Sequence, residues 1–176
     1  MLSPFPVRLL DHDPDWPRQA AERAARLRVL EPVLVAVHHI GSTAVPGLIA
    51  KPIIDLMPLV TDLAALDVER GAVEALGYQW HGEYGIPGRR YCTMDVGGRR
   101  VAQLHCFAMG SPQAHRHLAF RDYLRAHSGI AAAYAEVKRR ARDRHPGDHQ
   151  AYGAEKQAWI DRAEADALIW YSTRNA

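Results

Sequence analysis

An α+β fold is predicted for this chain, with a mixed β-sheet, flanking helices and a helical C-terminal part. Three observations support this prediction. Short β-branched or alternating segments, which are typical of strands, recur up to about residue 110, and helix patterns fall between them. Beyond Ser111 the pattern is helical to the end of the chain. Strands interleaved with helices indicate one layered core, so residues 1–176 are expected to form a single domain.

The first elements follow one another closely along the sequence. A short strand is expected at 7–10, and a helix pattern over 18–31 ends at Pro32. Two β-branched runs predict strands at 33–40 and 52–60. About a dozen residues separate these two strands, which is short for a parallel crossover. Either an antiparallel pairing or a short helix within the connection would accommodate this length.

The middle of the chain predicts a helix followed by several strands. Thr61 or Asp62 can cap a helix over 63–76, and Gly77 ends it. Strand patterns follow at three places, 78–81, 89–96 and 99–107. Gly97-Gly98 joins the last two, and a Gly-Gly pair between alternating runs indicates a β-hairpin.

Three helices are predicted after this hairpin. Ser111 suits an N-cap position with Pro112 as the first helical residue, and Ser128 and Asp148 mark two later starts. Residues 111–147 carry eight basic and three acidic side chains. This local positive charge could hold a phosphate-bearing ligand, or it could be the solvated face of an arginine-rich helix.

The composition is that of a folded protein without a membrane partner. Apolar residues make up 48% and charged residues 24% of the chain, and no apolar stretch approaches the length of a membrane span. The first residues lack the layout of a signal peptide, so a cytoplasmic location is expected. Cys92 and Cys106 are then expected to be free packed thiols, unless adjacent strands bring them together. A net charge of +2 carries no general nucleic-acid signature, and a protein partner is left open.

Residues 38–57, HHIGSTAVPGLIAKPIIDLM, form the most informative stretch. A strand that ends in Gly41-Ser42 exposes backbone N–H groups in a turn, and these groups with the serine hydroxyl can bind phosphate oxygens. Lys51 comes too late for a P-loop, which needs its lysine directly after the second glycine, but it remains a candidate phosphate contact. Asp55 is a lone carboxylate in an apolar run. It is therefore either functional or a structural acid that caps a neighbouring turn.

This stretch resembles the signature of the GrpB family. Other blocks resemble the family in the same order and span nearly the whole chain, namely GYQWHGEYGIPGRRY, LHCF, HLAFRDYLRAH, YAEVK and YGAEK. The resemblance implies a nucleotidyltransferase-like fold. Similar domains occur fused to dephospho-CoA kinase, which implies that an accessory role is also possible for such a domain.

The implied fold brings a specific expectation about metal ions. Nucleotidyltransferases resemble one another in a Gly-Gly or Gly-Ser turn, two alternating acids on the next strand and a third acid on a later strand, which together hold two metal ions. Ile40-Gly41-Ser42 matches the turn and Asp55 matches one acid, but Ile53 and Met57 stand where its partner would be. The later strand offers His105. Asp55 and His105 are thus candidate catalytic residues and ligands of one divalent ion, Mg²⁺, Mn²⁺ or Zn²⁺, with a plain Asp–His hydrogen bond as the alternative.

Arginines in the family-like blocks are candidate phosphate contacts. Arg89 and Arg90 are neighbours in a strand, so they point to opposite faces and one of them can reach a pocket. Arg121 lies one helical turn from Arg125, and either faces a phosphate or pairs with Asp122.

Two Tyr–Lys pairs occur at i and i+4 in the C-terminal part, where they share a helix face. Lys138, which follows Tyr134 within the basic segment, is interpreted as a ligand contact. Lys156, which follows Tyr152, is interpreted as a lysine that extends from a packed tyrosine towards solvent.

These features predict two alternative functions. The first is a nucleotidyltransferase-like protein that binds or acts on a nucleotide or another phosphorylated small molecule, with an incomplete carboxylate set and a possible dependence on metal. The second is a non-catalytic nucleotide- or phosphate-binding module, or an accessory module that interacts with another protein. The missing carboxylates favour the second function, whereas the Gly-Ser turn is compatible with both.

Overall fold

A five-stranded mixed β-sheet forms the centre of the molecule. The computed structural model describes residues 5–174, and its strands lie in the order β1-β2-β5-β4-β3. β2 and β5 are parallel, and the other neighbouring pairs are antiparallel. The strands are β1 (Leu34–Ile40), β2 (Ile54–Val60), β3 (Gln79–Trp80), β4 (Arg89–Val96) and β5 (Arg99–Ala108). The predicted α+β class with a mixed sheet is confirmed.

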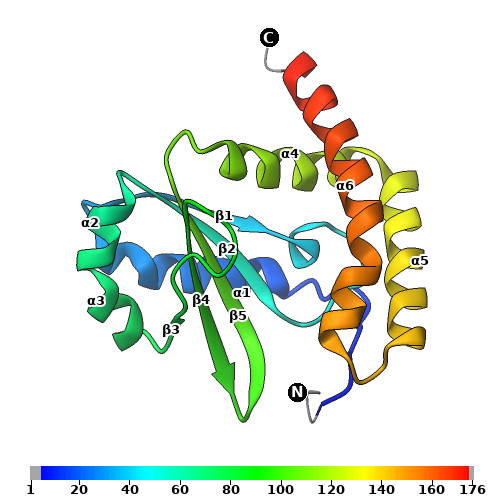
Figure 1. Cartoon of the computed structure of the whole chain (residues 1–176), viewed down its shortest axis with the longest axis horizontal. Helices are drawn as coiled ribbons and strands as arrows, with labels where there is room; N and C mark the ends of the chain where they lie inside the picture. Colours follow the sequence, from blue (N-terminus) through cyan, green and yellow to red (C-terminus); the bar gives the residue numbers. More distant parts are fainter. Residues whose placement is uncertain (1–4, 175–176) are drawn as a thin grey trace.

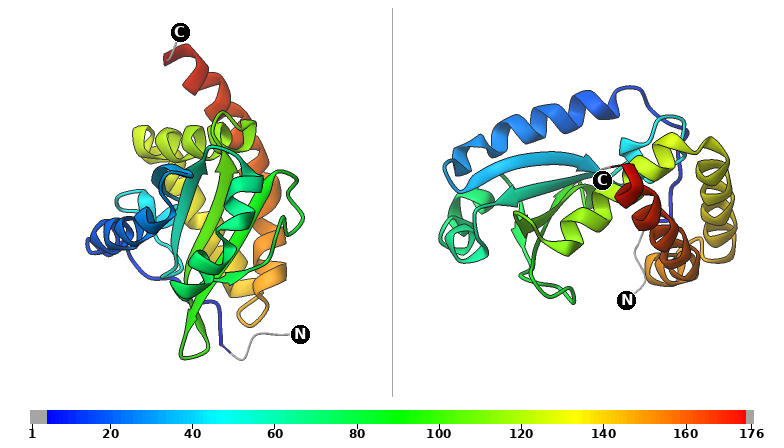
Figure 2. Two further views of the ribbon diagram at one scale, coloured as in Figure 1. Left: turned by 90° about the vertical axis from the view of Figure 1, so that its left-hand side faces the viewer. Right: turned by 90° about the horizontal axis from the view of Figure 1, so that it is seen from above.

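Helices flank the sheet on both sides. Figure 2 shows α1 along one face and α4 on the other. α6 packs against both α4 and α5, and its C-terminal end projects past the rest of the molecule (Figure 1). The helices are α1 (Trp16–Arg26), the 3₁₀ turn η1 (Leu27–Leu30), the 3₁₀ turn η2 (Ser42–Ala44), α2 (Leu63–Val68), α3 (Arg70–Ala75), α4 (Pro112–Ala126), α5 (Ser128–Arg144) and α6 (His149–Arg174). The helical C-terminal part is therefore also confirmed.

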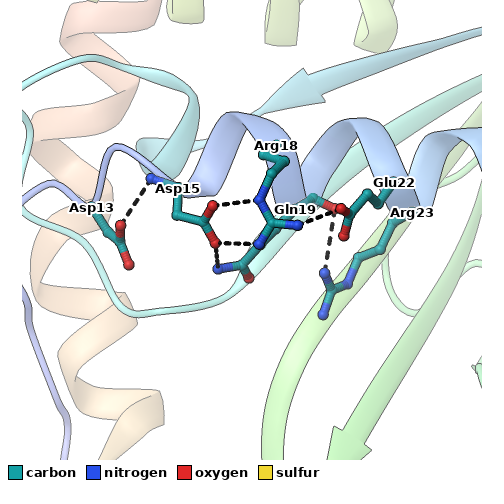
Figure 3. A network of polar contacts seen from close by, with 6 residues as sticks. All are labelled: Asp13, Asp15, Arg18, Gln19, Glu22 and Arg23. Atoms are coloured by element: carbon teal, nitrogen blue, oxygen red, sulfur yellow. Dashed lines mark hydrogen bonds and ion pairs between the residues drawn. The ribbon is translucent and has the colours of Figure 1, made fainter.

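The acidic segment before α1 forms side-chain hydrogen bonds with the first turn of this helix. Asp15 occupies the N-cap position without capping a backbone N–H. Its carboxylate instead accepts hydrogen bonds from Arg18, at 2.6 Å, and from Gln19, at 3.0 Å, in an exposed network (Figure 3). Exposed ion pairs contribute little to stability, so the burial of Trp16 and Leu27 is what holds this helix on the sheet.

The strand predicted at 7–10 is not formed, and this prediction is wrong. Within this segment only Leu10 pairs, in an isolated bridge with Ala50. The Val7 N–H donates to the carbonyl of Pro146 at 2.7 Å, and the Val7 side chain packs against Tyr152. Val7 and Leu9 are thus buried against the C-terminal helices, whereas Leu10 packs against the main core.

The connection between β1 and β2 combines the two solutions that its length allowed. The strands are antiparallel, with Ile40 opposite Asp55, and the connection contains the short η2 turn. The helix predicted over 63–76 is divided into α2 and α3, because Glu69 adopts a backbone conformation outside the helical range. Asp62 caps α2 by accepting a hydrogen bond from the Ala65 N–H at 2.8 Å.

The predicted hairpin and helix starts agree with the structure. Gly97 and Gly98 both have positive φ, 58° and 74°, which the tight turn between β4 and β5 requires. The Ser111 hydroxyl caps α4 by accepting a hydrogen bond from the Gln113 N–H at 3.2 Å. Asp148 caps α6 in the same way.

One face of the sheet is apolar and buried. Ile54, Leu56 and Leu104 point to this face and pack with α1, η1, α2 and α3 in the main core. Cys92 and Cys106 are also buried here as free thiols, as interpreted from the sequence. Their mutual hydrogen bond and burial raise the pKa of the Cys106 thiol. The opposite face is covered by the C-terminal helices and carries polar side chains.

None of the helices described between residues 5 and 174 combines the length and the apolar character that crossing a membrane requires.

Candidate functional site

A cavity of about 280 Å³ lies between the polar face of the sheet and the three C-terminal helices. The turn after β1, the start of β2, the middle of β5, and one face each of α4, α5 and α6 form its walls. Its polar lining residues are Gly41, Ser42, Thr43, Lys51, Asp55, Gln103, His105, His117, Arg121, Tyr134, Lys138, Tyr152, Lys156 and Glu164. The structure therefore brings together seven of the residues singled out in the sequence: Gly41, Ser42, Lys51, Asp55, His105, Arg121 and Lys138.

Gly41 is a glycine because the Asp55 carboxylate packs against it. The residue has a positive φ of 73°. A Cβ atom at this position would lie 2.7 Å from Asp55 Oδ2, which is closer than Cβ atoms in folded proteins approach a non-bonded neighbour. The turn and the lone acid that attracted attention in the sequence are thus two halves of one structure.

Asp55 and His105 meet inside the cavity through a hydrogen bond. Nε2 of His105 lies 3.3 Å from Oδ1 of Asp55, and Nδ1 of His105 lies 3.5 Å from a guanidinium nitrogen of Arg89. Because a guanidinium can only donate, Nδ1 accepts and Nε2 carries the proton that is donated to Asp55. His105 therefore orients the carboxylate, in agreement with the hydrogen-bonded alternative for this pair.

The donor set does not fit the two-metal centre that the fold implies. Asp55 and His105 are its two candidate ligands, and Ile53 and Met57 on the Asp55 strand provide no oxygen. Among the residues that the structure describes, no three histidine, cysteine, aspartate or glutamate side chains form a group that could hold a metal ion. A single ion on Asp55 would have to take its other ligands from water and a bound phosphate, as Mg²⁺ often does.

Lysine is rare in this chain and is concentrated at the cavity. Lysine occurs three times among 22 lysine and arginine residues, at positions 51, 138 and 156, and all three side chains line the cavity. Lys138 is the most buried, with 2% of its surface exposed. Its ammonium group donates hydrogen bonds to the Ser42 hydroxyl and, at 2.9 Å, to the carbonyl of Ile49. The ammonium group of Lys156 lies over the Tyr152 ring, 4.2 Å from its centroid.

The three ammonium groups lack a full counter-charge. Within residues 5–174, none of them makes an ion pair with a carboxylate. Burial lowers the pKa of Lys51, lowers that of Lys138 well below its usual value, and lowers that of Lys156 to about 8. Repulsion by the other pocket lysines lowers the pKa values of Lys138 and Lys156 further, Arg100 lowers that of Lys51, and Asp55 offsets part of the effect for all three. An anion in the cavity would remove this imbalance.

The other charged groups at the cavity are already paired. Arg121 lines it, but its Nε donates to Asp122 at 2.8 Å and its Nη1 donates to the carbonyl of His39 at 3.2 Å. The pairing alternative considered for Arg121 is thus present, and the arginine braces the end of β1. Glu164 forms an ion pair with Arg116. The charge left for a ligand comes mainly from the lysines.

Arg89 and Arg90 point to opposite faces, as their alternation predicts, and neither lines the cavity. Arg90 turns away from the site and binds Asp67 through two hydrogen bonds, one of 2.6 Å. A direct phosphate contact by Arg90 is therefore not what the structure shows. Arg89 faces the site side, where its guanidinium contacts His105 and donates to the carbonyls of Glu83 and Tyr84.

Several lining residues were not identified as site residues from the sequence, among them Lys156, His117 and Glu164. Lys156 was interpreted as extending to solvent, but it faces the cavity, because α6 packs over the site. The rarity of lysine in an arginine-rich chain was the signal that could have identified it. His117 and Glu164 carried no such signal, since their positions depend on helix packing. Burial lowers the pKa of His117 to about 3, so this imidazole is neutral near pH 7.

Comparison with known proteins places the chain in a family. A family model described as "GrpB protein" matches residues 6–166. The chain is 39% identical over 170 residues to the UPF0157 protein YqkA of Bacillus subtilis (strain 168), over 96% of this chain and 49% of the relative. It is 33% identical over 192 residues to a dephospho-CoA kinase of Mycolicibacterium paratuberculosis, over 94% of this chain and 47% of that protein. The chain spans about half the length of both relatives.

Solved structures show the same relationship. The crystal structure of conserved protein GrpB from Enterococcus faecalis superposes with a TM-score of 0.87 at 36% identity, over 93% of this chain and 99% of that one. Cid1 in complex with its short product ApU covers 70% of this chain and 39% of its own at 15% identity and a TM-score of 0.48, too weak a likeness for a comparison of sites. From the match over residues 6–166 and the identity to these relatives, we conclude that the chain belongs to the GrpB family.

Proposed function

We propose that this protein binds a nucleotide or another phosphorylated small molecule in the lysine pocket, the cavity lined by Lys51, Lys138 and Lys156. The observation that supports the proposal is that every lysine of the chain lies at this one cavity, and none of them is paired with a carboxylate of residues 5–174. A phosphate would supply the missing negative charge and accept hydrogen bonds from the ammonium groups. Binding alone does not require catalysis, so the proposal also covers a non-catalytic accessory module. The proposed location of this module is the cytoplasm.

A metal-assisted transfer reaction is the second candidate, and Asp55 favours it. The carboxylate lines the pocket, and Oδ1 is its one oxygen with a hydrogen-bond partner among the described residues. The proposed ligand phosphate would have to complete the coordination of any Mg²⁺, Mn²⁺ or Zn²⁺ ion. Because only Asp55 and His105 are available on the protein, we assign no step of a reaction to such an ion.

Isothermal titration calorimetry with nucleoside mono-, di- and triphosphates tests the first proposal. The titrations are done at pH 7 in EDTA, and Lys156→Met is compared with wild type. Loss of one desolvated charge should weaken binding about tenfold or more. Arg162→Met, on an exposed part of the same helix, removes the same charge away from the pocket and should leave the affinity unchanged. Equal affinities of all three proteins, or no binding, would reject the lysine pocket.

The same titrations with added Mg²⁺, Mn²⁺ or Zn²⁺ test the second candidate. If Asp55 holds a metal ion, one of these ions should tighten binding in wild type and have no effect in Asp55→Asn. Binding that is unchanged by the ions in both proteins would exclude a metal role for Asp55.

A further inference from the structure

A second cavity, of about 740 Å³, adjoins the lysine pocket. It lies between the β4–β5 hairpin, the chain before α1 and the start of α6. Lys51, Ile53 and Gln103 line both cavities. The two cavities are therefore adjacent, and a molecule held by its phosphate in the lysine pocket could extend towards the second one.

Tyr84 presents an aromatic ring at this second cavity. Its ring stacks on that of Tyr91, with centroids 5.1 Å apart and planes inclined by 23°. Tyr84 nevertheless remains 67% exposed, so one side of its ring is packed and the other is accessible. Exposed aromatic rings that are packed on one face are well suited to stack a planar group on the other.

The backbone of Tyr84 is held in an unfavourable conformation. Its φ is 48°, and it is the one residue other than glycine with a positive φ in the part of the chain that the structure describes. The neighbouring positions Gly82, Gly85 and Gly88 have positive φ without such a cost. The backbone strain at Tyr84 costs free energy, and its largely exposed side chain buries little surface that could offset this cost. Backbone strain of this kind is found mostly at functional sites.

Hydrogen bonds from Arg89 hold the backbone at Tyr84 in place. Its side chain is buried, and Nη2 donates to the carbonyl of Tyr84 at 2.8 Å while Nε donates to that of Glu83 at 3.2 Å. Its guanidinium also lies over the Tyr91 ring, 4.7 Å from the centroid. One buried cation thus fixes both rings of the stack, which gives Arg89 a positioning role.

The ring stack is also joined to the floor of the lysine pocket. The Tyr91 hydroxyl donates to Oε1 of Gln103 at 2.7 Å. Gln103 is opposite Asp55 in the pairing of β2 and β5. The position of the Tyr91 ring relative to the lysine pocket is therefore set by the sheet, and Tyr84, in the loop between β3 and β4, is held against it by the ring stack and by Arg89.

We propose that Tyr84 is the stacking surface for a planar aromatic ring of the ligand, whose phosphate lies in the lysine pocket. The ligand class is then a nucleotide or another phosphorylated molecule with an aromatic ring. This assignment rests on the proposed function and adds the part of the ligand that the lysines cannot recognise.

Calorimetric titration of three matched probes tests the assignment. Adenosine 5′-monophosphate and uridine 5′-monophosphate carry a base, whereas 1-O-methylribose 5-phosphate has the same sugar and charge without one. At pH 7 in EDTA, wild type should bind both nucleotides about tenfold more tightly than the sugar phosphate, the gain typical of one stacked base. Tyr84→Phe should retain this gain.

Tyr84→Gly should lose the gain and bind all three probes like the sugar phosphate. Glycine accepts the positive φ, so this variant should also unfold at the same or a higher temperature than wild type, which separates a ligand role from a structural one. Equal affinity of wild type for the three probes, or an equal loss for all three in Tyr84→Gly, would overturn the stacking role.

The probes also distinguish the two proposals. If the sugar phosphate binds wild type and Lys156→Met weakens it, but the base adds nothing, the stacking role fails and the lysine pocket stands. If none of the three probes binds, the lysine pocket fails and the stacking role fails with it.

Discussion

The two faces of the sheet are built from alternate residues of the same strands, yet they differ in what they bury: one carries the main apolar core, and the other buries charged groups next to an apolar cluster of Ile40, Met57 and Phe107. In β5, Leu104 and Cys106 point into the apolar core beneath α1, whereas Gln103 and His105 point to the lysine pocket. The apolar face gains free energy by removing hydrocarbon from water. The polar face holds buried ammonium groups whose charge is not balanced within the protein, which lowers stability. This contrast indicates that the first face maintains the fold and that the second is arranged for a ligand.

The largest effect is expected from damage to the apolar face. Leu104 is 1% exposed, so Leu104→Ala should lower the free energy of unfolding by about 2–5 kcal/mol through lost packing and a residual cavity. Nucleotide affinity should stay unchanged, because the neighbouring polar side chains face the other way. Urea denaturation and calorimetry measure the two quantities. An affinity loss as large as that of Lys156→Met would show that the two faces are not independent.

A smaller effect is expected at the edge of the polar face, where two neighbouring arginines can be compared. Arg89→Gln leaves the carbonyls of Glu83 and Tyr84 without the donor that the buried guanidinium provides, so it should cost about 2 kcal/mol and increase amide exchange in residues 82–88. Arg90→Gln loses a partly exposed ion pair with Asp67 and should cost less than about 1 kcal/mol. Hydrogen exchange with urea denaturation compares them. Similar results for both variants would contradict the positioning role of Arg89.

Removal of a pocket lysine should stabilise the ligand-free protein, whereas the substitutions described above destabilise it. At pH 7, Lys156 is charged although burial lowers its pKa to about 8. Lys156→Met should therefore raise the free energy of unfolding of the ligand-free protein by about 1–2 kcal/mol while it weakens binding. Differential scanning calorimetry against Arg162→Met, which should not differ from wild type, measures the gain. A lower melting temperature for Lys156→Met would mean that the lysine stabilises the fold.

The smallest expected effect is a dependence of stability on pH. Between pH 8 and about 10.5, the unfolded chain retains a proton that Lys156 has lost in the folded protein. Stability should therefore rise with pH in this window, by about 1 kcal/mol from pH 8 to 9. Below pH 8 both states hold the proton and this contribution is constant. Urea denaturation of wild type and Lys156→Met across the window isolates it, and equal pH dependence in the two proteins would contradict the lowered pKa.

Local patterns explain how much could be predicted from the sequence. The strands, the Gly97-Gly98 hairpin and the caps at Asp62, Ser111 and Asp148 follow from alternation and turn chemistry, which involve neighbours in the chain. The prediction of a strand at 7–10 was wrong because the sequence pattern is the same whether the apolar residues pack against a sheet or against helices. The site residues between Gly41 and Asp55 could be predicted because they lie in one continuous stretch, as the residues of the hairpin do.

The amino-acid sequence alone determined which side chains share a face, because a strand repeats every two residues and a helix about every 3.6. Alternation was enough to separate Arg89 from Arg90. The packing of α4, α5 and α6 on the sheet decided which of those faces meet. Lys51 comes from the loop before β2, whereas Lys138 and Lys156 come from the consecutive helices α5 and α6. Their convergence depends on how these helices pack on the sheet, which no local period records. The function proposed for this protein is therefore carried by an arrangement of charge that only the folded chain creates.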